Sequence, residues 1–162
     1  MFELSGFYTY TDAKFQEYVG PNGDDLSGQV FPRAPKNAYS ITATLIPPMD
    51  PAKGEIRLSL TYRYQDAYDY NDDYALEKTL AGTALPNGVL YNKAQIIEAQ
   101  RTLSANLDWK EVLGSNFDLA IFGENLTNRR YLLPYMGISS VYETRTPAAP
   151  RTVGVRLTAH FK

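Results

Sequence analysis

The sequence predicts an all-β protein, an antiparallel up-and-down meander of about six strands. Three observations predict it. Six segments alternate apolar and polar residues with a period of two, which places every second side chain on the same face of a strand. These segments are rich in Thr, Tyr and Val, which strands favour. The segments between them are rich in Gly, Pro, Asn and Asp and alternate between short and long, as expected when successive strands run up and down one sheet.

The first three strands are expected at residues 2–11, 39–46 and 55–64. The third is the most regular, because every even position is apolar or tyrosine and every odd position is polar or charged. In the first strand Phe7 falls on the polar side, so the alternation is less regular. Residues 47–54 contain prolines and a glycine, which predicts a short turn between the second and third strands.

The last three strands are expected at residues 102–109, 117–125 and 151–162. The fourth and sixth alternate throughout, whereas Phe122 interrupts the fifth by falling on its polar side. The connection between the fourth and fifth strands is again short. The long, polar connections are those at residues 16–35, 65–95 and 127–150, and all of them fall at one end of the meander. Long loops in compact proteins commonly carry function.

The composition excludes several classes of function. The 162 residues have a formal net charge of −2, which gives no bulk attraction to nucleic acid. The absence of cysteine excludes disulfides and thiolate metal sites, and a single histidine, His160, excludes a His-rich metal centre. His160 falls on the polar side of the last strand, where we expect it to be solvated. No nucleophile elbow, phosphate loop or zinc motif occurs, so we expect no catalytic residue, no metal and no cofactor.

Two environments produce this alternation. In a soluble sandwich or barrel the apolar face points inward, and in an outer-membrane barrel it points outward to lipid. The membrane is favoured because the long loops share one end, the strands approach the roughly 9–11 residues that cross a bilayer, and aromatic residues gather at both ends of the apolar face. The expected belts are Trp109, Phe117 and Phe161 at one end and Tyr8, Tyr10, Tyr39, Tyr62 and Tyr64 at the other. The alternative is a soluble core capped by aromatic residues.

Six strands are too few to close a lipid-facing barrel, since bacterial single-chain barrels begin at about 8 strands. An open sheet in lipid would leave two edges of unpaired N–H and C=O groups, each costing several kcal/mol. The chain is therefore expected either to belong to a larger barrel or to assemble with other chains. Met1 leads directly into a strand without a signal peptide, which favours the first option and predicts a C-terminal fragment of a longer protein.

Two motifs near the end of the chain resemble a known family. The stretch NFDLAIFGENLTNRRY, residues 116–131, resembles the C-terminal region of TonB-dependent outer-membrane receptors, and PRTVGVRLTAHF, residues 150–161, is similar to their closing strand. Lys162 departs from the pattern, since the family usually ends at the aromatic residue. The resemblance implies that residues 1–162 are the C-terminal segment of a 22-stranded transmembrane β-barrel, about its last six strands, without the plug domain and the earlier strands.

The resemblance also implies a function. Receptors of this family bind a scarce nutrient outside the cell, often an iron–siderophore complex, and draw it through the barrel when TonB, powered by the proton gradient, remodels the plug. It implies a place in the bacterial outer membrane among lipid and lipopolysaccharide, with TonB bound through the missing N-terminal part. The closing strand resembles the signal read by the barrel-assembly machinery, here Val155, Leu157, Ala159 and Phe161. We expect no enzymatic activity and no nucleic-acid partner.

The long connections hold the candidate ligand-binding residues. One of them interleaves tyrosines, which stack on flat or catecholate ligands, with carboxylates, which hold Ca²⁺ through oxygen, although the EF-hand spacing is not met. Its candidates are Tyr68, Tyr70, Asp72, Asp73 and Tyr74. In another connection Arg130 and Tyr131, with Arg129 beside them, suit an anionic ligand or a lipopolysaccharide phosphate. The alternatives are a solvated loop in the first case and a loop base pinned by Tyr131 in the second.

Three functions remain open from the residues. They are a receptor for TonB-dependent uptake, a passive porin-like outer-membrane barrel, and a soluble β-barrel that binds an apolar ligand inside. A plug domain upstream distinguishes the first two, and the third requires the apolar faces to converge on a common interior. Polar-face charges such as Arg57, Arg63 and Arg156 either line a path through the barrel or belong to its hydrated wall, and we favour the second reading.

Overall fold

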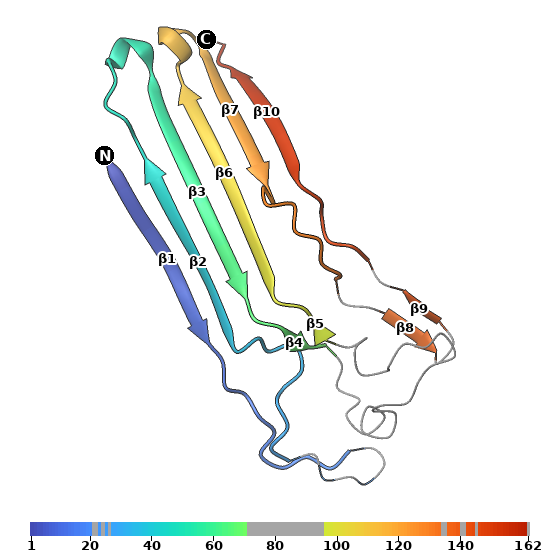
Figure 1. The fold of residues 1–162 in the computed structure, drawn as a ribbon. Helices are drawn as coiled ribbons and strands as arrows, with labels where there is room; N and C mark the ends of the chain where they lie inside the picture. The colour runs from blue at the N-terminus through green and yellow to red at the C-terminus, as the bar shows by residue number, and fades with distance from the viewer. Residues whose placement is uncertain are drawn as a thin grey trace.

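The computed structural model describes residues 1–20, 23, 25, 27–70, 96–133, 136–139, 142–144 and 146–161. Its main feature is a six-stranded sheet in which every strand is antiparallel to its neighbours (Figure 1). The strands follow one another across the sheet in chain order: β1 (Phe2–Tyr10), β2 (Asn37–Leu45), β3 (Glu55–Gln65), β6 (Gln100–Lys110), β7 (Phe117–Glu124) and β10 (Thr152–Ala159). The six-stranded up-and-down meander expected from the sequence is confirmed.

Two small ribbons lie at the end of the sheet where the long connections gather (Figure 1). In one, β4 (Tyr68–Asp69) pairs with β5 (Ile96–Ile97), and in the other, β8 (Met136–Ser139) pairs with β9 (Tyr142–Thr144). The sequence did not predict these strands, because segments of this length are too short to display an alternation.

The last strand is shorter than expected. The sequence predicts a strand up to Lys162, yet β10 ends at Ala159. Ala159 pairs with Phe117, the first residue of β7, so the ladder has no partner strand beyond that point. The His160 N–H still donates to the Asn116 carbonyl at 2.9 Å, and Phe161 follows outside the strand. A strand ends where its neighbour ends, and alternation along one segment carries no information about the neighbour.

Two short turns close the other end of the sheet. The 3-10 helix η1 (Pro51–Lys53) joins β2 to β3, and η3 (Val112–Gly114) joins β6 to β7. The Asp50 carboxylate caps η1 by accepting a hydrogen bond from the Ala52 N–H at 3.0 Å. The turns lie against each other, since a Cβ built on Gly114 would fall 2.6 Å from the Ala52 carbonyl oxygen. Within the described ranges, no helix has the length and apolar character needed to span a bilayer.

The pairing register separates an apolar face from a polar face. The apolar face carries the even-numbered residues of β1 and β3 and the odd-numbered residues of β2, β6, β7 and β10. One row of this face crosses all the strands and consists of Leu4, Ala43, Leu60, Ala105, Gly123 and Val153. A slip of one residue in any strand would turn its apolar side chains onto the polar face, so the alternation and the register support each other.

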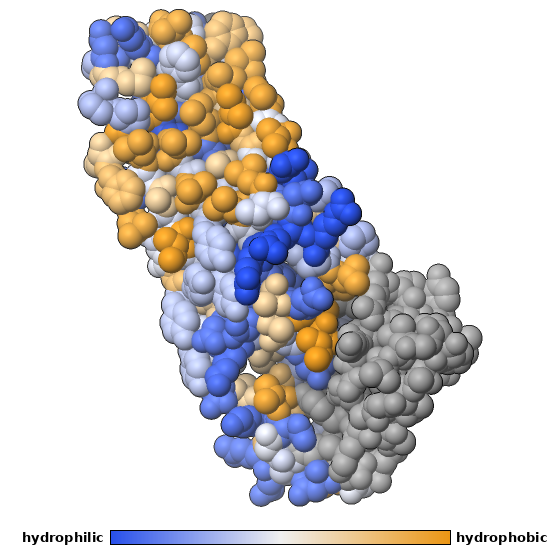
Figure 2. Space-filling model, in the orientation of Figure 1, coloured by the Kyte–Doolittle hydropathy of each residue, from blue (hydrophilic) through white to orange (hydrophobic). Residues whose placement is uncertain are grey.

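The apolar face is the exposed one. Leu4 in an edge strand is 67% exposed and Leu60 in a central strand is 46% exposed, whereas Ser40 on the polar face is only 8% exposed. Among the described residues, Ile97 is the buried hydrophobic side chain, and it lies outside the main sheet. Figure 2 shows hydrophobic side chains over most of the strand region and hydrophilic ones toward the loop end. The sheet therefore presents apolar side chains to its surroundings instead of burying them.

The polar face is held by contacts between its own side chains. Thr42 Oγ1 lies 2.9 Å from Thr61 Oγ1, which satisfies two hydroxyl groups across β2 and β3. Phe122, which breaks the alternation of β7, pairs with Gly154 of β10, where a Cβ would overlap the Phe122 ring. The Arg156 guanidinium lies 5.7 Å from the centroid of that ring. The Phe122 ring thus covers Gly154, and this contact explains why a phenylalanine lies on the polar face.

Candidate functional site

Aromatic residues lie at both ends of the apolar face, where the sequence predicts two belts. Near the long connections, Tyr8, Tyr39 and Tyr64 form one row across β1, β2 and β3. The Tyr39 and Tyr64 rings are stacked, with their centroids 5.0 Å apart. Near the short turns, the Trp109 indole Nε1 donates to the Lys53 carbonyl at 2.9 Å. Each belt therefore combines a large apolar surface with a polar tip that finds a partner.

A polar network fastens the loop ends of the first three strands. The Tyr8 hydroxyl donates to Asn37 Oδ1 at 2.8 Å, and the Asn37 side-chain amide donates to Asp66 Oδ2 at 2.6 Å. The Tyr64 hydroxyl donates to Asp66 Oδ1 at 2.7 Å. These donors, the Tyr64 hydroxyl first and the Asn37 side chain second, hold the pKa of the Asp66 carboxyl below its ordinary value.

Two long connections meet through Arg33, a residue that the sequence analysis did not single out. The Arg33 N–H donates to the Asp69 carbonyl at 2.6 Å, and Arg33 Nε donates to the Tyr70 carbonyl at 3.2 Å. The guanidinium also lies 4.2 Å from the centroid of the Tyr70 ring. Of the predicted ligand-binding residues, Tyr70 is therefore engaged by a neighbouring loop and Tyr68 lies in β4.

The other candidates of that connection, Asp72, Asp73 and Tyr74, lie outside the described residues. Among the residues that the structure does describe, no group of three or more His, Cys, Asp or Glu side chains is placed to hold a metal ion.

The base of the last long connection is built around Asn125, which the sequence predicted only as the end of the fifth strand. Its side chain is largely enclosed, since Asn125 is only 5% exposed. Nδ2 donates to the carbonyls of Arg129 at 2.9 Å and Ala149 at 3.1 Å, and Oδ1 accepts from the Arg129 N–H at 2.9 Å. Asn125 has a φ of 49°, in the left-handed region that asparagine tolerates better than most residues. An asparagine directly after a strand and before a polar turn was the available signal.

The two candidate ligand-binding residues of this connection, Arg130 and Tyr131, differ in exposure. Arg130 is exposed, whereas Tyr131 is half-buried at the base of the loop. The Tyr131 carbonyl accepts from the Ala148 N–H at 2.9 Å, so the two arms of the connection are held together at this level.

Tyr131 also lines a hollow of about 370 Å³ on the polar face, near the loop end. The same hollow is lined by Phe7, Arg63, Thr102 and Glu124. Phe7 is 63% exposed, so an aromatic ring stands open on the polar side. One concavity therefore offers rings for stacking, a cation, a carboxylate and hydroxyl groups, which suits a polar ligand with a flat portion.

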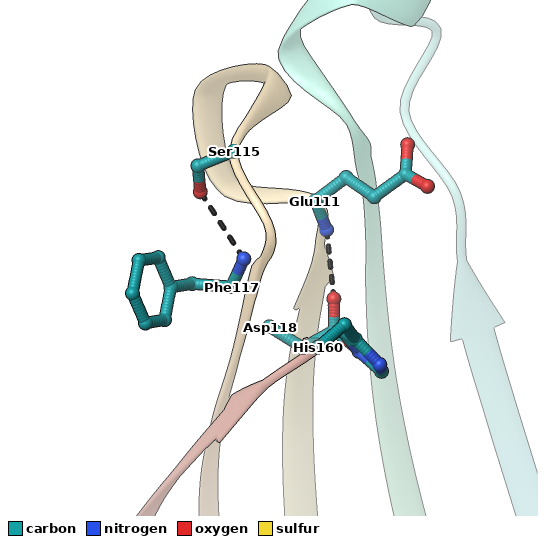
Figure 3. Close-up of polar contacts among 5 residues, drawn as sticks. All are labelled: Glu111, Ser115, Phe117, Asp118 and His160. Atoms are coloured by element: carbon teal, nitrogen blue, oxygen red, sulfur yellow. Dashed lines mark hydrogen bonds and ion pairs between the residues drawn. The ribbon is translucent and has the colours of Figure 1, made fainter. Parts of the chain in front are cut away.

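The rim beside the short turns holds the only histidine of the chain. His160 Nε2 lies 2.9 Å from Asp118 Oδ2, and Asp118 Oδ1 accepts from the Glu111 N–H at 2.9 Å (Figure 3). The expectation of a merely solvated histidine is thus incomplete, because the exposed ring also joins the end of the last strand to β7. The alternation did not reveal this contact, since it depends on which strands are neighbours.

The residues expected to form the assembly signal follow the outer strand β10. Val155 and Leu157 are exposed on its apolar face, Ala159 ends the strand, and Phe161 lies exposed just beyond it. In the described part of the chain, β10 pairs with β7 on one side only, so its other edge carries free backbone groups.

Comparison with solved structures finds the same fold in two receptors. The ferric-catecholate import receptor Fiu from E. coli K12 matches 99% of this chain at a TM-score of 0.63 and 20% sequence identity, over 19% of the receptor's length. The ferric yersiniabactin uptake receptor FyuA from Yersinia pestis matches 86% of the chain at a TM-score of 0.61 and 16% identity, over 18% of its length. No family model and no curated protein sequence matches the chain. The chain therefore has the fold of a part of these receptors and spans less than a fifth of either one.

Proposed function

We propose that residues 1–162 form the C-terminal part of the barrel wall of a TonB-dependent outer-membrane receptor, which takes up a scarce nutrient such as an iron–siderophore complex. The observation that carries this proposal is the exposed apolar face, with Leu4 and Leu60 turned outward and Ser40 covered on the opposite face. A soluble β protein buries its apolar face, whereas a barrel in lipid exposes it.

The size of the apolar face supports the same proposal. From Ile56 to Tyr64, the outward positions of β3 span about 26 Å along the strand. At the tilt of about 40° that is usual in such barrels, this span rises about 20 Å across the membrane, which approaches the apolar band of about 25 Å flanked by aromatic girdles. Tyr64 stands in the tyrosine row at one end of this span, and Ile56 pairs with Trp109 at the other.

The two free edges of the sheet support a larger barrel. In the described part of the chain, β1 and β10 each pair with one neighbour. Free strand edges are costly in hydrocarbon, so further strands are needed to close the wall. A longer protein supplies them, and this chain spans less than a fifth of the length of either receptor matched by fold.

The polar face then lines the lumen, and the hollow around Arg63 and Tyr131 lies on the path of the ligand. The hollow is lined by residues at the ends of the strands near the long connections, which supports a position at the outer mouth of the proposed barrel. The two receptors of similar fold are named for the uptake of ferric complexes, one of them a ferric catecholate, and a cation beside aromatic rings suits an anionic ligand that carries rings.

Uptake by the complete protein that carries this chain tests the proposal. We expect cells that express it to accumulate radioactive iron supplied with a siderophore, and to stop when TonB is deleted or the proton gradient is collapsed. Uptake that persists without the gradient would contradict the proposal and indicate a passive pore.

A pair of variants on one strand tests the role of the hollow. Arg63→Gln removes the cation of the hollow and is expected to raise the ligand concentration needed for half-maximal uptake by about tenfold. Arg57→Gln is the matched control, because Arg57 lies on the same face of β3, outside the hollow, 3.9 Å from Glu3. Equal effects of the two changes would contradict a role for the hollow.

A further inference from the structure

The hollow near the loop end holds two opposite charges. Arg63 of β3 and Glu124 of β7 both line it, and within the described ranges no other charged residue does so. Both residues are exposed, and among the described residues neither forms an ion pair. One cation and one carboxylate give the hollow no net charge, so it does not attract a purely anionic ligand as a whole. It favours a ligand that carries its own charges in the opposite order.

The sheet determines the order of the groups across the hollow. One row of the polar face consists of Phe7, Ser40, Arg63 and Thr102. Ser40 is small and covered, so the exposed Phe7 ring and the Arg63 guanidinium are the large groups on this side. Glu124 lies on the other side, since β7 follows β6. Phe7, Arg63 and Glu124 are each two strands apart, which is about 10 Å from one to the next across the sheet.

The floor between the two charges is polar but neutral. Strand β6 lies between β3 and β7, and its residues Gln100, Thr102 and Ser104 line the hollow. Amide and hydroxyl groups both donate and accept hydrogen bonds, so they suit the amide groups of a ligand. The hollow therefore offers, in sequence, an aromatic ring, a cation, neutral hydrogen-bonding groups and a carboxylate.

We propose that the hollow selects a dipolar ferric complex, in which an anionic part with rings meets Phe7 and Arg63 and an ammonium group meets Glu124. The inference rests on the proposed function and names the substrate class of its hollow. Glu124 is then a specificity-determining residue, because its carboxylate attracts an ammonium group and repels a ligand that is anionic throughout. An amino acid or short peptide joined to the iron-binding rings has this chemistry, since it supplies both amide groups and an ammonium group.

A second hollow supports the direction of this dipole. It has a volume of about 330 Å³, and Glu124 and Ser104 line it as well as the first, so the two hollows meet at Glu124. Its other charged residues are Asp108 and Arg156. Two carboxylates against one cation make this side of Glu124 more negative than the side of Arg63, which favours an ammonium group here.

Two forms of one probe test the proposal with the complete, detergent-solubilised protein. The probe is the ferric complex of a catecholate joined to lysine, with the side-chain amine of the lysine either free or acetylated. Acetylation removes the positive charge and leaves the iron centre and the rings unchanged. We expect the native protein to bind the free form about tenfold or more tightly than the acetylated form, and we expect the difference to shrink at high salt.

Three variants assign the preference to one side chain. Glu124→Gln is expected to bind the free form as weakly as the acetylated form, with no loss of affinity for the latter. Glu55→Gln is the matched control, because Glu55 lies on the same face at the opposite end of β3, outside both hollows. This control should keep the native preference. Arg63→Gln should weaken the binding of both forms by the same factor, since Arg63 meets the part that they share.

The contrary results are equally specific. Equal binding of the two forms by the native protein, or a preference that persists in Glu124→Gln, would overturn the proposal. Failure of the proposed function alone has a different signature, in which the preference is measured by binding but iron uptake does not depend on TonB. A protein that binds neither form would overturn both.

Discussion

At the residue scale, Asn125 joins the end of β7 to both arms of the last long connection through three hydrogen bonds. We predict that Asn125→Ala lowers the free energy of unfolding by about 3 kcal/mol, because enclosed backbone groups lose their partners. The loosened loop base should also be cut faster by trypsin after Arg129 and Arg130. Urea unfolding and timed proteolysis of the reconstituted protein measure the two effects.

Asn128→Ala is the control for this prediction. Asn128 has a φ of 51°, close to that of Asn125, yet it is exposed. Its replacement by alanine therefore introduces backbone strain but removes no enclosed amide. We expect Asn128→Ala to lower the free energy of unfolding by about 1 kcal/mol. If both variants lose the same stability, the hydrogen bonds of Asn125 are not the cause.

The carboxyl of Asp66 makes the stability of the folded protein depend on pH. Its pKa lies below the ordinary value of 3.8, mainly because the Tyr64 hydroxyl and the Asn37 side chain donate to the ionised form. The resulting stabilisation is present above the ordinary pKa and is lost as the pH falls through the lower, folded value. We predict that Asp66→Asn unfolds at a lower temperature than the native protein at neutral pH, and that the difference disappears in strong acid.

Thermal unfolding at a series of pH values checks this prediction. Asp12→Asn is the control, since Asp12 is exposed and its partner is the equally exposed Lys14 at 3.7 Å. Exposed ion pairs contribute little, so this control should follow the native protein at every pH. A difference in unfolding temperature between Asp66→Asn and the native protein that stays constant across the pH series would contradict the prediction.

At the scale of the elements, the two short turns depend on glycine. Gly54 follows η1 with φ 86° and ψ −164°, a region that is almost restricted to glycine, and a Cβ there would overlap the Lys110 carbonyl oxygen. We predict that Gly54→Ala lowers the free energy of unfolding by about 3 kcal/mol, because strain and a clash with the backbone act together. Denaturant unfolding measures the change.

Gly28→Ala separates strain from crowding. Gly28 has a similar φ of 82°, but nothing lies within 4 Å of a Cβ built on it. We therefore expect a loss of about 1 kcal/mol for this variant, from strain alone. Similar losses at the two glycines would show that the contact between the turn and β6 contributes nothing.

At the scale of the whole molecule, the prediction concerns what each face of the sheet meets. Leu58 and Ser59 are adjacent in β3 and lie on opposite faces, and the chain contains no cysteine that would compete for a label. We predict that a spin label on Leu58→Cys in lipid vesicles is relaxed by oxygen, which dissolves in the bilayer. A label on Ser59→Cys should instead be relaxed by a water-soluble nickel complex.

Val155→Cys extends the test to the edge strand and should behave as Leu58→Cys does, since both residues lie in one row of the apolar face. A label on Leu58→Cys that is shielded from both reagents would place this side chain inside packed protein. That result would contradict the membrane orientation and support a soluble barrel.

Much of this fold could be predicted from local pattern. A strand turns successive side chains to opposite faces, so the alternation in residues such as Ile56 to Tyr64 indicates strands, their faces and the belts at their ends. The lengths of the connections indicate the antiparallel order. The alternation is equally compatible with an apolar face turned inward or outward, and the folded chain shows this face exposed at Leu4 and Leu60.

The candidate site was predicted less well, because its contacts join residues that are distant in sequence. The network of Tyr8, Asn37 and Asp66, the contact of Arg33 with Tyr70, and the pair of His160 with Asp118 each depend on which strands and loops are neighbours. Alternation describes one strand at a time and carries no information about contacts with other strands and loops. Local chemistry thus determined the strands and their two faces, whereas pairing across the sheet decided where strands end, which charges are balanced and which remain free to bind.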